Sequence, residues 1–134
     1  MNYTKLEQKL GKQIEADWHQ ASGRGWIHKN AKVENEANIQ DNAIVMGNAW
    51  VSGNALVYGN ALVSGYARVF GNAWVYDNAI ISGNARVSDN ARVYDNARVF
   101  GNAWVFGNAW VYDNAWVSGN ALVYGNALIY AYKE

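Results

Sequence analysis

The sequence has 134 residues, which is enough for one domain with a modest core. Its formal net charge is zero, so charge gives no argument for a nucleic-acid polymer or an anionic membrane as a partner. It contains no Cys, which excludes disulfide bonds and thiolate metal sites. The N-terminal segment has no hydrophobic run, and no later run reaches membrane-spanning length. We therefore expect a cytoplasmic protein.

Residues 1–24 are predicted to form an amphipathic helix and a loop. Thr4 and Glu7 have the spacing of a capping box, which would begin the helix near Thr4. The loop Ser-Gly-Arg-Gly at residues 22–25 ends it, so we expect a helix over residues 4–20. Its apolar residues recur every four positions as one stripe: Leu6, Leu10, Ile14 and Trp18.

Residues 25–132 repeat in steps of six. Each hexad reads Ala-x-Val or Ala-x-Ile, nearly always after Asn, and from Asp41 onward that Asn follows Gly or Asp. Ala and Val alternate with x like a short strand, so both point to one side of the chain. Gly, Asp and Asn tolerate the left-handed backbone region that a corner needs. A strand and a corner cannot bury an apolar face alone, so the hexads must stack into a β-solenoid.

The residue that follows each Val or Ile has a longer period. In every third hexad it is Tyr: Tyr58, Tyr76, Tyr94, Tyr112 and Tyr130. Three hexads per coil give 18 residues and a triangular cross-section. The eighteen hexads from Gly25 then form six coils, about 29 Å long at a strand spacing of about 4.8 Å. We expect an all-β, three-sided parallel solenoid, whose first coil the N-terminal helix caps by covering its core and its unpaired strand edge.

This pattern resembles the hexapeptide-repeat, left-handed parallel β-helix family, and the resemblance covers residues 25–132. The stretch GRGWIHKNAKVENEANIQDNAIVMGNAWV also looks like the start of phage and bacterial proteins with GNAxV repeats. One feature departs from the family, which favours a small residue directly after the aliphatic one. Here Ser, Tyr or Phe commonly takes that place, and Gly or Asp comes one residue later. The resemblance implies left-handed coils, a homotrimer and, if phage-encoded, the host-cell cytoplasm.

The residue x between Ala and Val must face outward, and on all three sides it is mostly a large apolar residue. Exposed apolar surface of this extent usually marks an interface, which favours the trimer. A second interpretation is that the aromatic residues form ladders along the solenoid faces and stabilise the stack.

The charged residues gather in the middle coils, where Arg86, Arg92 and Arg98 fall on three different sides of one turn. They could form a solubilising belt of Arg–Asp pairs with Asp77, Asp89 and Asp95. Alternatively, Arg beside aromatic rings could bind a small anionic, ring-containing ligand, because guanidinium groups match phosphate or carboxylate and rings stack on bases. The residues predicted for such a site are Arg68, Arg86, Arg92, Arg98, Trp74, Trp104, Trp110, Tyr76, Tyr94 and Tyr112.

The sequence offers no catalytic constellation. Many members of the resembled family are acyltransferases that bind coenzyme A and use a His base on an extruded loop, but these repeats have no insertion, and the two histidines are His19 and His28. We predict no catalytic residue, no metal and no cofactor. The expected function is a trimeric binding protein, such as a phage accessory protein that sequesters a nucleotide-like ligand between subunits. The alternatives are a structural module that binds only protein and, third, an acyltransferase relative.

Overall fold

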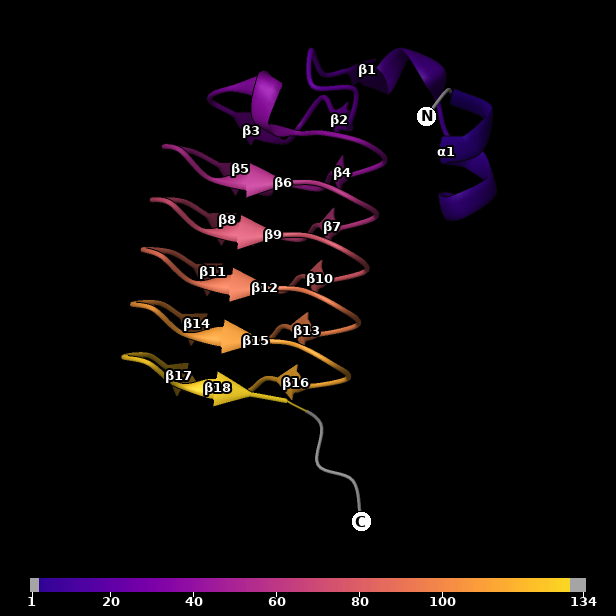
Figure 1. Cartoon of the computed structure of the whole chain (residues 1–134). Helices are drawn as coiled ribbons and strands as arrows, with labels where there is room; N and C mark the ends of the chain where they lie inside the picture. The colour runs from indigo at the N-terminus through magenta and orange to yellow at the C-terminus, as the bar shows by residue number, and fades with distance from the viewer. Residues whose placement is uncertain (1–2, 131–134) are drawn as a thin grey trace.

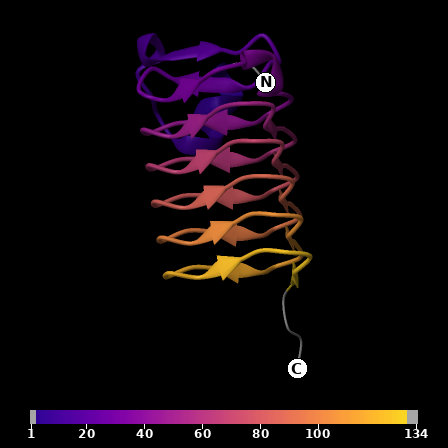
Figure 2. The same cartoon turned by 90° about the vertical axis from the view of Figure 1, so that its left-hand side faces the viewer.

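The structure, a computed structural model, describes residues 3–130 as a short N-terminal helix followed by a β-solenoid (Figure 1). The helix is α1 (Tyr3–Leu10), and two 3-10 turns lie at Glu15–Asp17 and Glu36–Asn38. The solenoid has about six coils, stacked one on another with the N-terminal helix beside the first ones (Figures 1 and 2). This confirms the predicted β-solenoid.

The strands form three sheets, one on each side of the coil. The first sheet contains β1 (Trp18–Gln20), β2 (Trp26–His28), β4 (Ile44–Val45), β7 (Leu62–Val63), β10 (Ile80–Ile81), β13 (Arg98–Val99) and β16 (Trp116–Val117). The second contains β3 (Lys32–Val33), β5 (Trp50–Val51), β8 (Arg68–Val69), β11 (Arg86–Val87), β14 (Trp104–Val105) and β17 (Leu122–Val123). The third contains β6 (Leu56–Val57), β9 (Trp74–Val75), β12 (Arg92–Val93), β15 (Trp110–Val111) and β18 (Leu128–Ile129).

From β4 onward each strand pairs in parallel with the strand three places on, and β2 and β3 pair with β4 and β5; all these pairs have a shift of 18 residues, as the tyrosine spacing predicts. Ile80, for example, pairs with Leu62 on one side and with Arg98 on the other. The outer residues of one sheet therefore form a straight row along the solenoid. This register decides which side chains become neighbours on the surface.

Ala and Val or Ile fill the interior, as predicted. Every Ala and Val of the coils from Ala43 to Val111 is at most 2% exposed. Fully burying one Val contributes roughly 1.5–3 kcal/mol, so the repeated pairs supply the apolar burial that the short strands need. The core is one column of small side chains.

The sequence predicts a corner at Gly or Asp followed by Asn, and in the structure it is the Gly or Asp, not the Asn, that adopts the left-handed conformation. The backbone φ there is +62° at Gly83 and +56° at Asp95, with similar values at the equivalent corners. Glycine adopts this conformation without strain, and Asp tolerates it better than most residues do.

The N-terminal helix is shorter than the apolar stripe predicts. It ends at Leu10 because Gly11 takes a φ of +85° and its N–H bonds to Glu7 O at 2.7 Å, as a C-terminal glycine does. Ile14 is 68% exposed, whereas Trp18 is buried as part of β1 and not of a helix. The helix already includes Thr4, which therefore is not the residue before it that a capping box needs, and one Glu7 carboxylate oxygen accepts from the Gln13 N–H at 3.1 Å.

The cap on the first coil is also built differently from the prediction. The strand β1 pairs antiparallel with β2 and covers the free edge of the first sheet. Residues 21–25 cross the adjoining backbone so closely that a Cβ on Gly23 would lie 2.5 Å from Ala37 O. The helix α1 instead lies beside the coils, where Leu6 packs with Trp18, Trp26 and Ile44 on the outer face of the first sheet (Figure 1). One apolar side of the solenoid is therefore partly covered by its own chain.

Candidate ligand-binding surface

The register distributes the predicted site residues over all three sheets. Six of them lie on the third sheet or directly after its strands: Trp74, Arg92 and Trp110 in the strands, and Tyr76, Tyr94 and Tyr112 two residues later. Arg68, Arg86 and Trp104 lie on the second sheet, and Arg98 lies alone on the first. The residues therefore form separate surfaces and not one pocket.

On the third sheet the aromatic residues form the ladder that the second interpretation predicts. The ring centroids of Tyr76 and Tyr94 are 5.0 Å apart and nearly parallel, and those of Tyr94 and Tyr112 are 5.3 Å apart. The Arg92 guanidinium lies between two indole rings, 4.4 Å from the Trp74 centroid and 5.1 Å from that of Trp110. Most of these ring faces contact each other or Arg92, so they are closed to a ligand that would stack between them.

The tyrosine ladder also changes the acidity of its hydroxyl groups. Burial raises the pKa of Tyr58, Tyr76 and Tyr94, because a phenolate is solvated poorly against neighbouring rings. For Tyr76, the Arg92 guanidinium offsets part of this effect. These hydroxyl groups are neutral hydrogen-bonding groups at physiological pH.

The second sheet carries the densest positive charge. Arg68 and Arg86 occupy the same register position on the neighbouring strands β8 and β11. Each guanidinium lies over an indole on its outer side, Arg68 at 5.3 Å from the Trp50 centroid and Arg86 at 5.4 Å from that of Trp104. The Trp104 Nε1–H donates to the buried Ser88 Oγ at 3.2 Å, which fixes that ring. Two arginines thus stand side by side between two tryptophans, and we call these four residues the arginine pair site.

A hollow of about 200 Å³ adjoins the arginine pair site. It is lined by Trp50, Ser52, Arg68 and Phe70. Trp50 and Phe70 give it apolar walls, and Arg68 and the Ser52 hydroxyl give it polar groups. Trp50 and Phe70 were not among the predicted site residues, although the 18-residue spacing from Trp50 to Arg68 would have placed Trp50 there.

The arginines do not form the alternative belt of Arg–Asp pairs. Among residues 3–130, no ion pair joins an Arg to an Asp. The corner aspartates instead bind the backbone of the next coil: Asp95 Oδ2 accepts from the Asp113 N–H at 3.0 Å, and Asp89 Oδ2 accepts from the Gly107 N–H at 3.0 Å. The carboxylates are used at the corners because a backbone donor lies within reach there, so the guanidinium groups keep their charge uncompensated.

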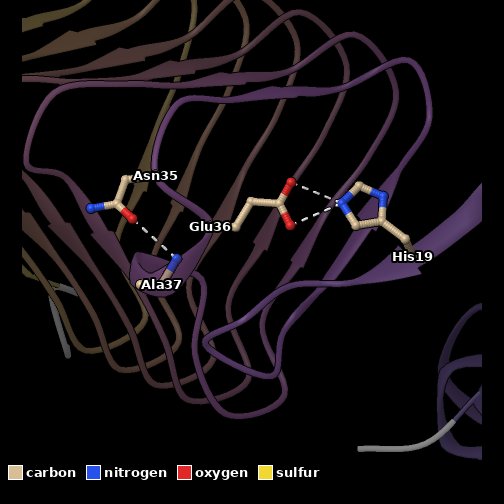
Figure 3. A network of polar contacts seen from close by, with 4 residues as sticks. All are labelled: His19, Asn35, Glu36 and Ala37. Atoms are coloured by element: carbon tan, nitrogen blue, oxygen red, sulfur yellow. Dashed lines mark hydrogen bonds and ion pairs between the residues drawn. The ribbon is translucent and has the colours of Figure 1, made fainter.

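The two histidines lie at the N-terminal cap. His19 Nε2 is 3.0 Å from both carboxylate oxygens of Glu36, and Asn35 accepts from the Ala37 N–H to cap the same 3-10 turn (Figure 3). His28 Nδ1 accepts from the Asn30 N–H at 3.3 Å, and its ring packs edge-on against Trp18. Both histidines therefore have structural contacts that join β1 and β2 to the first coil.

Metal and membrane features are missing from the part of the chain that the structure describes. No group of three or more His, Asp or Glu side chains within residues 3–130 is placed to hold a metal ion. The described helices include none with the length and apolar character needed to cross a bilayer.

Comparison with known protein families identifies a match for the repeats. A family model described as YdcK Beta solenoid repeat matches six stretches that together cover more than half of the chain: residues 49–65, 55–69, 67–83, 81–93, 91–106 and 115–131. No curated protein and no solved structure gave a significant match.

Proposed function

This chain belongs to the YdcK β-solenoid repeat family, and we propose that it is a non-enzymatic binding protein for a small anionic, ring-containing ligand such as a nucleotide. The observation that carries this proposal is the arginine pair site, where two cations are held in register and neither forms an ion pair with an acidic residue among residues 3–130. The ligand's phosphate or carboxylate would lie between Arg68 and Arg86.

The electrostatics of the pair favour an anion. Neighbouring strands lie about 4.8 Å apart, and like charges placed opposite each other destabilise a sheet. Each guanidinium lies over an indole ring, Arg68 over Trp50 and Arg86 over Trp104, and this cation–π contact occupies none of its N–H groups with an acceptor. A phosphate between the two guanidinium groups would remove the repulsion and accept from both forks.

The hollow beside Arg68 suits the rest of the ligand. Its apolar walls at Trp50 and Phe70 can pack against a flat ring, and the Ser52 hydroxyl can hydrogen-bond to ring nitrogen or oxygen atoms. At about 200 Å³ it is smaller than the 300–1,000 Å³ of drug-sized pockets, so it would take one ring and leave the phosphate outside.

We further propose that the coils are left-handed and that three chains assemble through the third sheet. The 18-residue coil and its three sheets agree with the resemblance to hexapeptide-repeat proteins, which implies this handedness and a trimer. The third sheet is the best candidate for self-association because α1 covers part of the first and the second carries Lys32, Arg68 and Arg86. The second sheet would then border the groove between subunits, and a phage-encoded chain would sequester its ligand there, in the host cytoplasm.

The alternative is a structural module that binds only protein. The closed ring faces of the third sheet favour it, because a ladder of stacked tyrosines stabilises the solenoid without any ligand.

A titration with the double variant Arg68→Gln/Arg86→Gln separates these two functions. The probes are a panel of mononucleotides and dinucleotides, and calorimetry measures the binding of each. We expect the double variant to weaken binding by at least about tenfold, since each charge-assisted bond contributes roughly 1.5–3 kcal/mol. Arg98→Gln, on the first sheet, is the matched control and should bind like the parent.

Native mass spectrometry of protein purified from cells completes the test. A trimer that carries extra mass, lost on denaturation, would support sequestration and give the mass of the ligand. A bare protein that binds no probe, with the double variant altering only assembly or solubility, would favour the structural module.

A further inference from the structure

A second hollow lies on the first sheet, directly beyond the C-terminal end of α1. Its volume is about 280 Å³, and Leu62 and Ile80 form its floor. The helix buries Ile44 in the same row of outer residues, whereas Leu62 and Ile80 remain partly exposed. The hollow is therefore the continuation of the apolar strip on which α1 packs.

Two cations border this apolar floor. Lys9, in the last turn of α1, donates from Nζ to Asn60 O at 2.9 Å, which leaves two of its three N–H groups available. Arg98 follows Ile80 in the register of the sheet, and its guanidinium lies 5.6 Å from the Trp116 ring centroid. Neither forms an ion pair among residues 3–130. Partial burial lowers the pKa of the Lys9 ammonium, so a nearby anion would stabilise its charged form.

The wall of the hollow offers amide donors. Some corner asparagines bond to one another, as Asn84 Nδ2 does to Asn102 Oδ1 and Asn42 Nδ2 does to Asn60 Oδ1, both at 3.3 Å. Within residues 3–130, the side chains of Asn78 and Asn96 make no such bond, and both line the hollow. The adjoining Asp77 and Asp95 accept from backbone N–H groups of the next coil and do not line it. The hollow thus has cationic and amide donors around an aliphatic floor.

We propose that this hollow binds a small amphipathic carboxylate, with the carboxylate between Lys9 and Arg98 and a short aliphatic tail on Leu62 and Ile80. A planar carboxylate matches the fork of Arg98, and Asn78 or Asn96 can donate to its second oxygen. The apolar floor selects against inorganic phosphate, which has no tail to bury there. The site is distinct from the arginine pair site because it lies on another sheet and uses none of its residues.

Calorimetric titration with hexanoate tests this inference on the full-length Arg68→Gln/Arg86→Gln variant, in which the arginine pair site can no longer bind the anionic probes. Hexanol, which has the tail without the charge, and inorganic phosphate, which has charge without the tail, are the two other probes. We expect hexanoate to bind at concentrations below about 10 mM and both other probes to bind at least about tenfold more weakly. Shifts of the Leu62 and Ile80 methyl resonances would place the tail.

Arg98→Gln should weaken hexanoate binding by at least about tenfold, and Lys9→Gln should act in the same direction. Arg98 does not hold the helix, so its variant remains informative even if Lys9→Gln loosens α1. Lys32→Gln, an exposed cation on the second sheet that lines neither hollow, is the matched control and should leave hexanoate binding unchanged. Equal binding of hexanol, an equal loss in Lys32→Gln, or methyl shifts elsewhere would overturn the proposal. Because nucleotide binding is tested with variants at other residues, either proposal can be contradicted without the other.

Discussion

At the scale of single residues, the corners explain why one position of the hexad holds either Gly or Asp. Both occupy the left-handed region there, at +62° for Gly83 and +56° for Asp95. Gly avoids the strain, whereas Asp offsets it by accepting a hydrogen bond from the next coil. Asp95 also stands between Asp77 and Asp113 along one edge, where like charges repel.

Replacement of Asp95 tests this balance. Asp95→Ala should lower the free energy of unfolding by about 1–2 kcal/mol, since Ala keeps the strain and loses the hydrogen bond. Asp95→Asn should stay within about 0.5 kcal/mol of the parent, because its amide oxygen can still accept and one repulsive charge is removed. Urea unfolding measures both. An alanine variant as stable as the asparagine variant would show that the bond contributes nothing.

Residue patterns predicted the interior well and the outer contacts poorly. Ala and Val, two residues apart, can only point to the inside of a coil together, so the hexad alone predicted the buried column and the left-handed corners. The Arg–Asp pairs considered from the sequence did not form, because a long side chain has several possible partners, and which of them lie nearby depends on the strand register. Asp89 instead accepts from the Gly107 N–H, and Arg86 lies over the Trp104 ring; both contacts join residues 18 positions apart.

At the scale of elements, the N-terminal segment shows how a periodic stripe can cross the boundary between two structures. Leu6 and Trp18 both belong to the predicted stripe and are both buried, yet one lies in α1 and the other in β1. Gly11 was the signal for this boundary, since a glycine after a helical pattern commonly ends the helix.

Two alanine substitutions separate the structure from the continuous helix. Leu6→Ala should undock α1, because deletion of a fully buried Leu side chain costs about 2–5 kcal/mol. Hydrogen exchange over Tyr3–Leu10 should accelerate by at least about tenfold, while the coils remain protected. Ile14→Ala is the matched control and should change nothing, since Ile14 is 68% exposed. Equal effects of the two substitutions would favour the continuous helix.

The tyrosine ladder of the third sheet predicts a loss of stability in alkali. Folding raises the pKa of Tyr58, Tyr76 and Tyr94 above the unfolded value near 10, so their contribution is complete below that pH and is lost as pH rises through the folded values. Each tyrosine lowers stability by at most about 1.4 kcal/mol per pH unit, and solvent screening keeps the slope well below this limit. Thermal unfolding between about pH 9 and 11 measures it.

The variant Tyr76→Phe serves as the control for this titration, since it keeps a ring in the ladder without the hydroxyl. Its stability should fall less steeply with pH than that of the parent, and ultraviolet absorbance of tyrosinate should show one late-titrating group fewer. Identical slopes in the two proteins would mean that the ladder does not cause the alkaline loss.

At the scale of the whole molecule, the three sides of the solenoid differ in what covers them. The first sheet is partly covered by α1, the second presents Lys32, Arg68 and Arg86, and the third presents stacked rings with Arg92 held between indoles. Parallel hexads therefore produce three surfaces with different chemistry. A ligand site and a subunit interface can then occupy separate sides of the same coil.

Self-association through the third sheet is the prediction that tests this division. Leu128 is 55% exposed at the end of that sheet, beside Trp110 in the register. Leu128→Glu should convert the proposed trimer to monomers, because three copies of a carboxylate would be buried without partners near the threefold axis. Ser118→Glu, in the same coil after β16 of the first sheet, is the control and should remain trimeric. Analytical ultracentrifugation gives the masses of the parent and of both variants. A parent protein that sediments as a monomer would contradict the trimer. A trimer that survives Leu128→Glu but not Ser118→Glu would show that the interface lies outside the third sheet.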